Sequence, residues 1–276
     1  MNKLNFGCGS RTAPGWINID FYAATPDVQR VNLLKRFPFP DGYFDAVYSS
    51  HVLEHFSPGD GGHLISEAFR VLKPGGILRT VVPDLEAACR EYLRILDSWD
   101  GTTAPKRYRW IMLELLDQMT RVAPSGEMAG YFGELRRGGD VDLITYVESR
   151  AGKFTQSSTP PGILAKLRGV NLKKIFNKLF YLYLHTAKYV FPKHIRSEVM
   201  VLTGFGERHR WMYDRLGLSI LFQSHGFADI TMRQAESSAI PRFNEDRLDS
   251  NSDGTPYKCV SLYCEAMKPM SSRIPA

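Results

Sequence analysis

Short apolar runs alternate with amphipathic stretches along the first 84 residues. Four runs with the apolar, β-branched or aromatic character of strands lie at residues 4–6, 16–20, 44–50 and 77–83. From His51 the pattern becomes helical, and a further helix is predicted to run to Leu72, where the sequence Lys-Pro-Gly-Gly stops it. Strands that alternate with helices at this spacing predict a parallel sheet with right-handed crossovers.

The strand pattern is interrupted after Asp84 by a long segment of helical character. Helices are predicted over residues 84–99, 107–122 and 172–190, and residues 155–162 are rich in Ser, Thr and Pro, which indicates a loop. The alternation then returns, with a helix at 213–226 and strands at 230–233 and 258–268. The pattern therefore predicts an α/β protein that carries a large helical insertion.

The composition, with 43% hydrophobic and 23% charged residues among 276, is that of a soluble globular protein with one large domain. No apolar stretch reaches the roughly 20 residues that span a bilayer, and the sequence runs at once into a glycine motif without the apolar region of a signal peptide. We expect a cytoplasmic protein with no transmembrane segment. Cys8, Cys89, Cys259 and Cys264 lack CxxC spacing and are expected to be reduced structural thiols, with Cys259 and Cys264 on opposite faces of one strand.

The net charge of +6 comes from one segment of the chain. Ten basic and no acidic residues lie between Glu148 and Glu198, which leaves 25 basic against 29 acidic residues elsewhere. The ten are Arg150, Lys153, Lys166, Arg168, Lys173, Lys174, Lys178, Lys188, Lys193 and Arg196. Such a block suits a phosphorylated substrate or an anionic membrane surface, and suits nucleic acid less well because no binding module accompanies it. A solvated basic helix face is the alternative.

Gly7-Cys8-Gly9 follows the first strand, where bare backbone lets a ligand approach closely. A dinucleotide fingerprint would need a third glycine where Thr12 stands, and no phosphate-loop GKS or GKT is present, so the ligand need not contain phosphate. Asp20 ends the second strand, where a carboxylate can accept both hydrogen bonds of a ribose diol. A turn or cap role is the alternative for Asp20.

These features occur in blocks whose order resembles the class I S-adenosylmethionine-dependent methyltransferases, of the type 11-like subgroup associated with saccharide biosynthesis. The blocks are residues 4–9, 15–20, 32–33 with 37–39, 43–55 and 70–76, and residues 209–214 and 261–266 are similar to the end of the same subgroup. The resemblance implies a Rossmann-like fold with a mostly parallel seven-stranded sheet, an antiparallel last strand and a large helical insertion after the fifth strand. It divides the chain into a cofactor-binding part (1–98), an insertion acting as lid or substrate region (99–205), a C-terminal part of the domain (206–268) and a tail (269–276).

The resemblance further implies S-adenosylmethionine as the cofactor. The residues it assigns to cofactor binding are Phe6, Gly7, Cys8, Gly9, Asp20, Phe21, Asn32, Leu33, Ser50 and His51. One position departs from the family, which usually has Asp where this chain has Asn32 to accept a hydrogen bond from the adenine amino group. The amide oxygen of Asn32 can still accept.

His51, Glu54 and His55 are spaced so that a helix would place them on one face. The resemblance puts Ser50 and His51 near the methionine part of the cofactor, with Glu54 and His55 holding the helix. An ordinary polar helix start and a divalent metal site are the two alternatives, in that order of preference, so that no metal site is expected.

Methyl transfer to a hydroxyl requires a base, and His51, His209 and Asp84 are the candidates in that order, each with a structural role as the alternative. The leading hypothesis is O-methylation of a saccharide or a phosphorylated saccharide precursor, in which the sugar comes from the resemblance alone. The alternatives are methylation of a small secondary metabolite, and a non-catalytic cofactor-binding protein that docks a partner or membrane through its basic insertion. The expected partner is a small, anionic or neutral molecule, and the sequence gives no oligomeric state.

Overall fold

The computed structural model describes residues 1–23, 25–99, 105–121, 125–152, 179, 182–183, 186, 188–192 and 208–270. The strands are β1 (Lys3–Phe6), β2 (Trp16–Asp20), β3 (Val28–Arg30), β4 (Phe44–Ser50), β5 (Leu72–Pro83), β6 (Ala228–Arg233) and β7 (Ser261–Met267). They form one seven-stranded sheet in the order β3-β2-β1-β4-β5-β7-β6. Strands β1 to β5 pair in parallel, and β7 is antiparallel to β5 and β6. The predicted Rossmann-like sheet with an antiparallel last strand is confirmed.

Alternate residues of each strand pack on opposite faces of the sheet. On β4, Val47 belongs to the core beneath α1 (Pro58–Val71) and α9 (Arg215–Ser224), whereas Tyr48 belongs to a second core on the other face. That second core includes Trp16 and Phe243, at the start of the short helix α10 (Phe243–Asp246). Both faces are therefore covered, as a parallel sheet requires.

Local capping fixes where the covering helices begin. Helix α1 starts after Ser57, whose Oγ accepts a hydrogen bond from the Asp60 N–H, and Pro58 occupies the first turn. Helix α9 starts after Asp214, whose carboxylate accepts from the Gly217 N–H at 2.7 Å. The predicted end of the first of these helices at Leu72 is confirmed within one residue.

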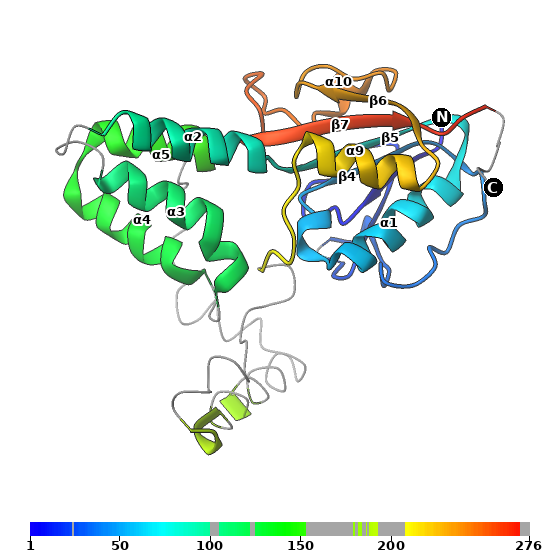
Figure 1. The fold of residues 1–276 in the computed structure, drawn as a ribbon. Coiled ribbons are helices and arrows are strands. Elements are labelled where there is room, and N and C mark those ends of the chain that lie inside the picture. The colour runs from blue at the N-terminus through cyan, green and yellow to red at the C-terminus, as the bar shows by residue number, and fades with distance from the viewer. Residues whose placement is uncertain are drawn as a thin grey trace.

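After β5 the chain enters the helical insertion, with α2 (Leu85–Asp97), α3 (Pro105–Thr120), α4 (Gly126–Gly138) and α5 (Val141–Ala151). These helices lie together beyond one end of the sheet (Figure 1) and enclose a core of their own around Trp110 and Val147. The helical character predicted after Asp84 is confirmed for these residues. Most of the helix predicted over 172–190 and most of the basic segment lie outside the described residues. Within 172–190, residues 179, 182–183 and 186 are described and helical, and η2 (Lys188–Val190) is a 3-10 turn.

Two expectations at the level of elements are wrong, and one strand was missed. No helix begins at His51, which has a left-handed φ of +54° and precedes a 3-10 turn, η1 (Leu53–His55). Strand β3 was not predicted, because three residues with only Val28 buried carry no periodic signal. Strand β7 starts at Ser261, so Cys259 and Cys264 do not share a strand.

No helix among the described residues has the length and apolar character needed to cross a membrane.

Candidate active site

A cavity of about 390 Å³ opens at the carboxyl edge of the sheet, beside β1 and β4. The chain continues from β1 toward β2 on one side and from β4 toward β5 on the other. Connections that leave in opposite directions open a crevice between the two strand ends, which is where α/β sheets bind ligands. The turn after β1 forms one wall of this cavity, and residues 50–55 after β4 contribute another.

The turn after β1 depends on its two glycines in different ways. Gly7 has φ +65°, and a Cβ built there would lie 2.9 Å from Cγ1 of Val52, so the closeness of the backbone to Val52 requires glycine. Gly9 has φ +53°, but a Cβ there would meet nothing within 4 Å. The absence of a side chain at Gly9 therefore leaves space in the cavity in which a ligand could contact the backbone directly.

Exchanging each glycine for alanine should separate these two roles. Gly7→Ala should lower the free energy of unfolding by about 2 kcal/mol or more, because a left-handed φ and an overlap with Val52 both oppose it. Gly9→Ala should cost about 1 kcal/mol of strain and mainly weaken S-adenosylmethionine binding, because its Cβ enters the open space. Denaturant unfolding and calorimetric titration measure the two quantities. Equal losses of stability in the two variants would contradict this division.

Asp20 joins the glycine turn to the end of β2. Its Oδ2 accepts a hydrogen bond from the Gly9 N–H at 2.9 Å, and its Oδ1 accepts from the Tyr22 N–H at 3.0 Å. Each carboxylate oxygen keeps a further lone pair, so the group can also accept from a ribose diol. The turn role that was the alternative for Asp20 is present, and it is compatible with the cofactor role.

Replacement of Asp20 by Ala should weaken S-adenosylmethionine binding by at least about 10- to 100-fold, the loss expected from a single hydrogen bond to a charged acceptor, which contributes about 1.5–3 kcal/mol. Isothermal calorimetry measures this change. Neither carboxylate lines the cavity itself, but Asp20 holds the Gly9 N–H of its wall. Asp27→Ala is the matched control, because Asp27 is a nearby exposed carboxylate that accepts from the Thr12 hydroxyl instead. Similar losses in both variants would mean that local charge, and not the position of Asp20, controls affinity.

The other residues assigned to the cofactor lie in three different environments. Phe6 and Leu33 are buried in the core, so only their backbone could face a ligand. Phe21 is half-buried and stacks on Phe56 with ring centroids 6.4 Å apart. Asn32 is exposed, and its Oδ1 accepts from the Leu34 N–H at 3.0 Å, which leaves one lone pair for adenine.

Cys8 and Ser50 line the first cavity. Burial, followed by the nearby charge of Asp20, raises the pKa of the Cys8 thiol to about 12, so the thiol is neutral and unreactive. This environment agrees with the expectation of a structural thiol. Cys264 is buried as well, and burial followed by the charge of Glu265 raises its pKa to about 12.

His51 lies between a carboxylate and a hydroxyl. Its Nδ1 is 3.3 Å from Oε1 of Glu54, and its Nε2 is 3.0 Å from Oγ of Ser261. Because a carboxylate only accepts, this geometry favours the tautomer with the proton on Nδ1. Nε2 then carries a lone pair at a distance where a hydroxyl can reach it. The left-handed backbone at His51, which costs energy in a non-glycine residue, marks the position as one held by its surroundings.

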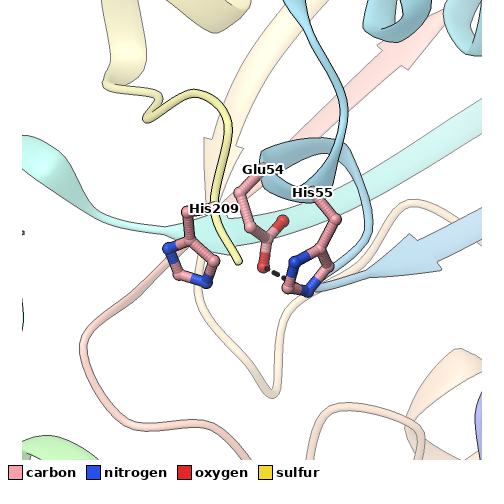
Figure 2. Close-up of side chains that lie close together, drawn as sticks. All are labelled: Glu54, His55 and His209. Carbon is pink, nitrogen blue, oxygen red and sulfur yellow. Dashed lines mark ion pairs between the residues drawn. The ribbon is translucent and has the colours of Figure 1, made fainter. Parts of the chain in front are cut away.

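Glu54, His55 and His209 form a compact group in the same cavity wall (Figure 2). The backbone carbonyl of Glu54 accepts from the Arg210 N–H at 2.6 Å, and the His209 N–H donates to the carbonyl of Gln118 at 2.9 Å. These bonds tie the strand-end turn, the chain after the insertion and α3 together. His209 thereby enters the site although it is 154 residues beyond His55 in the sequence.

The ionisation of this group follows from its burial. Burial opposes ionisation of Glu54, but a hydrogen bond from His51 and the charges of the neighbouring histidines together lower its pKa. Burial, partly offset by the charge of Glu54, lowers the pKa of His209 to about 4, so that its imidazole is neutral near pH 7. A base this weak is poorly matched to a hydroxyl at neutral pH.

A second cavity, of about 400 Å³, lies next to the first. Both cavities are lined by His51, Gln118, Arg121, His209 and Lys258. Asp84 lines the second cavity, but it is the N-cap of α2, with Oδ1 accepting from the Ala87 N–H at 3.0 Å. The structural role that was the alternative for Asp84 is therefore present.

Several lining residues were not anticipated from the sequence. Trp110, Glu114, Gln118 and Arg121 come from α3 and its end, and Lys258 precedes β7. Nothing in a helical pattern indicates which of its polar positions will face a cavity, because that depends on how the helix packs. The ion pairs of Arg121 with Asp117 and of Arg150 with Glu114 show that much of the polar lining is already paired.

Residues 4–80 match the family model described as a methyltransferase domain. The matched segment contains the glycine turn, Asp20 and residues 50–55 after β4. It identifies this part of the chain as that of an S-adenosylmethionine-dependent methyltransferase, whose cofactor is S-adenosylmethionine. The open backbone at Gly9 and the carboxylate of Asp20 fit that cofactor.

Similar solved structures include three methyltransferases. One, from Methanosarcina mazei, is 14% identical over 98% of this chain and 93% of that chain, with a TM-score of 0.41. Another, from Thermotoga maritima, is 10% identical over 97% and 82%, with a TM-score of 0.39. The third, from Haloferax volcanii in complex with the Trm112 methyltransferase activator, is 12% identical over 97% and 82%, with a TM-score of 0.38.

Proposed function

We propose that this protein transfers a methyl group from S-adenosylmethionine to a hydroxyl of a saccharide or a phosphorylated saccharide precursor. The single observation that carries the proposal is the position of His51, which lines both cavities at once. The glycine turn borders one cavity, and the helical insertion borders the other. A side chain at their junction can contact an acceptor held beside the cofactor.

When bound, S-adenosylmethionine supplies an electrophilic methyl group, whose transfer to an acceptor oxygen breaks the carbon–sulfur bond and leaves a neutral thioether. Nε2 of His51 accepts the proton of the acceptor hydroxyl, and Glu54 beside Nδ1 stabilises the resulting imidazolium. Ser261 shows that a hydroxyl can lie 3.0 Å from this nitrogen. We assign His51 the role of base and place His209 in a supporting position, since its pKa is low.

The lining of the second cavity supports a polyhydroxylated acceptor. Glu114, Gln118 and Lys258 offer hydrogen-bond donors and acceptors, and Phe132 adds an aromatic surface. Nζ of Lys258 lies over the ring of Tyr257, 5.5 Å from its centroid, and Lys258 lines the cavity, where its charge could meet an acceptor phosphate. Because Glu114, Gln118 and Phe132 belong to the helical insertion, we assign the insertion, residues 99–205, to substrate binding.

An apolar secondary metabolite is the second candidate acceptor, because Trp110, Met128 and Phe132 also line this cavity. A non-catalytic role is less well supported. Loss of catalysis would predict a blocked acceptor space or one without a base, whereas this cavity is open and His51 and His209 line it.

Transfer of radiolabelled methyl groups to a panel of acceptors tests the proposal. The panel should contain free sugars, sugar phosphates, nucleotide sugars and apolar phenols, each incubated with the protein and labelled S-adenosylmethionine. We expect label on the hydroxylated sugars, and more on their phosphorylated forms. Label on the phenols alone would favour the second candidate. Cofactor binding without transfer to any of them would count against catalysis on these acceptor classes.

A further inference from the structure

The carboxylate of Glu54 has fewer partners than a buried charge requires. Its side chain is fully buried, and its one donor is the long contact from Nδ1 of His51, 3.3 Å from Oε1. Oε2 has no partner among the described residues, and Nε2 of His55 lies 4.0 Å from Oε1. A buried carboxylate with so little hydrogen bonding is costly unless a cation or a metal compensates it.

His55 is oriented with one nitrogen free toward that carboxylate. Its Nδ1 lies 3.2 Å from the backbone carbonyl oxygen of Arg208, which can only accept, so Nδ1 carries the proton. The lone pair of the neutral ring is then on Nε2, on the side of Glu54. Metal-binding histidines are oriented in the same way, by donating their other N–H to a carbonyl.

His209 completes the group from a distant part of the chain. Its ring packs edge-on against His55 with centroids 5.1 Å apart, and it is 5% exposed. One ligand atom each from Glu54, His55 and His209 lies within 4.8 Å of the others. In Figure 2 the carboxylate lies between the two imidazole rings.

We propose that Glu54, His55 and His209 bind a divalent transition-metal ion of the zinc class. Two imidazoles and one carboxylate are the donors of open catalytic zinc sites, which keep a position for water or substrate. Tetrahedral zinc with bonds of about 2.0–2.2 Å holds its ligand atoms about 3.3–3.6 Å apart. The widest pair would therefore close by up to about 1.2–1.5 Å on binding.

The proposed ion lies in the wall of the active-site cavity, which all three ligands line. An acceptor hydroxyl in its open position would lose its proton more easily, because a bound cation stabilises the alkoxide. This consequence rests on the proposed O-methylation, and it narrows the acceptor to one whose oxygen can ligate a metal. The site itself does not depend on that function.

Cobalt and zinc titrations of the full chain, first stripped with a chelator, test the site directly. We expect one Co²⁺ per chain with visible absorption bands of a four- or five-coordinate ion, displaced by Zn²⁺. Glu54→Gln and His209→Gln should weaken Co²⁺ binding by more than the roughly 10- to 100-fold that loss of an outer partner produces. His225→Gln is the control, since His225 lies at the end of α9 and does not line either cavity.

Calorimetry with S-adenosylmethionine, run on the same variants, separates this site from the proposed function. Unchanged cofactor affinity with lost Co²⁺ binding would support the metal site and show that the variants are folded. Failure of the stripped wild type to bind stoichiometric Co²⁺ or Zn²⁺ would overturn the proposal, as would equal loss in His225→Gln. Metal binding that persists while no acceptor is methylated would leave the site standing and count against the function.

Discussion

Replacement of His51 by Gln is expected to lower kcat for methyl transfer by about 10²- to 10⁴-fold, the usual contribution of a general base. Glutamine keeps a polar side chain of similar size but cannot accept the hydroxyl proton. The affinity of the variant for S-adenosylmethionine should change little if the glycine turn and Asp20 hold the adenosyl part, as we propose. Steady-state transfer to the acceptor found in the panel, with separate calorimetry of the cofactor, measures both.

The same exchange at His225 provides the control for His51. Nδ1 of His225 donates a hydrogen bond to the Leu221 carbonyl at 2.8 Å, at the end of its own helix. His225 lies outside both cavities. It should leave kcat unchanged. Wild-type turnover in His51→Gln would show that another group removes the proton, whereas a loss confined to cofactor affinity would place His51 in binding alone.

Replacement of Arg79 by Met is expected to lower the free energy of unfolding by about 3–5 kcal/mol, the usual cost of removing one partner of a buried ion pair. Arg79 is fully buried on β5, where it pairs with Asp249 at 2.7 Å and with Glu265 at 2.8 Å. Methionine fills similar space, so the loss should come mainly from Asp249, which is left without its cation, while Glu265 keeps Arg233 at 3.1 Å. Denaturant unfolding followed by circular dichroism measures the difference.

The pH dependence of this loss has a defined sign. Burial already raises the pKa of Asp249, against the opposing charge of Arg79 and a hydrogen bond from Tyr48. Without Arg79 the folded-state pKa of Asp249 should rise further above its unfolded value. The folded protein then favours the protonated carboxyl, so its free energy of unfolding falls as the pH rises and this proton is lost. The deficit of Arg79→Met should therefore be smaller near pH 4 than near pH 7.

Arg90→Met is the matched control, since Arg90 also forms an ion pair, with Glu86 at 2.6 Å, but its side chain is 72% exposed. Exposed ion pairs contribute about 0–1 kcal/mol, so this variant should unfold almost like the wild type. An Arg79→Met variant that is as stable as Arg90→Met would mean that the buried network does not need its charge.

The elements that follow from local pattern could be predicted closely. The strands at residues 4–6, 16–20 and 44–50 and the helix up to Leu72 have their signals in consecutive residues: apolar runs, caps and a Pro-Gly-Gly stop. Gly7 and Asp20 could also be singled out, because a positive φ and a strand-end carboxylate leave local marks. Strand β3 could not be found, since its pairing with β2 and not its own composition makes it a strand.

The site required the tertiary structure. The sequence spacing placed His51 with Glu54 and His55 on one helical face and left a metal site there as the least favoured alternative, but the chain makes a left-handed turn at His51 instead of a helix. That turn directs His51 toward Ser261 of β7, and the return of the chain after the insertion brings His209 to Glu54 and His55. By itself, the sequence determined six of the seven strands and the glycine turn, because neighbouring residues encode these, and its resemblance to a family indicated the cofactor. Only the fold decided which distant histidine joins the carboxylate, because contacts between remote segments depend on packing and leave no periodic signal in either segment.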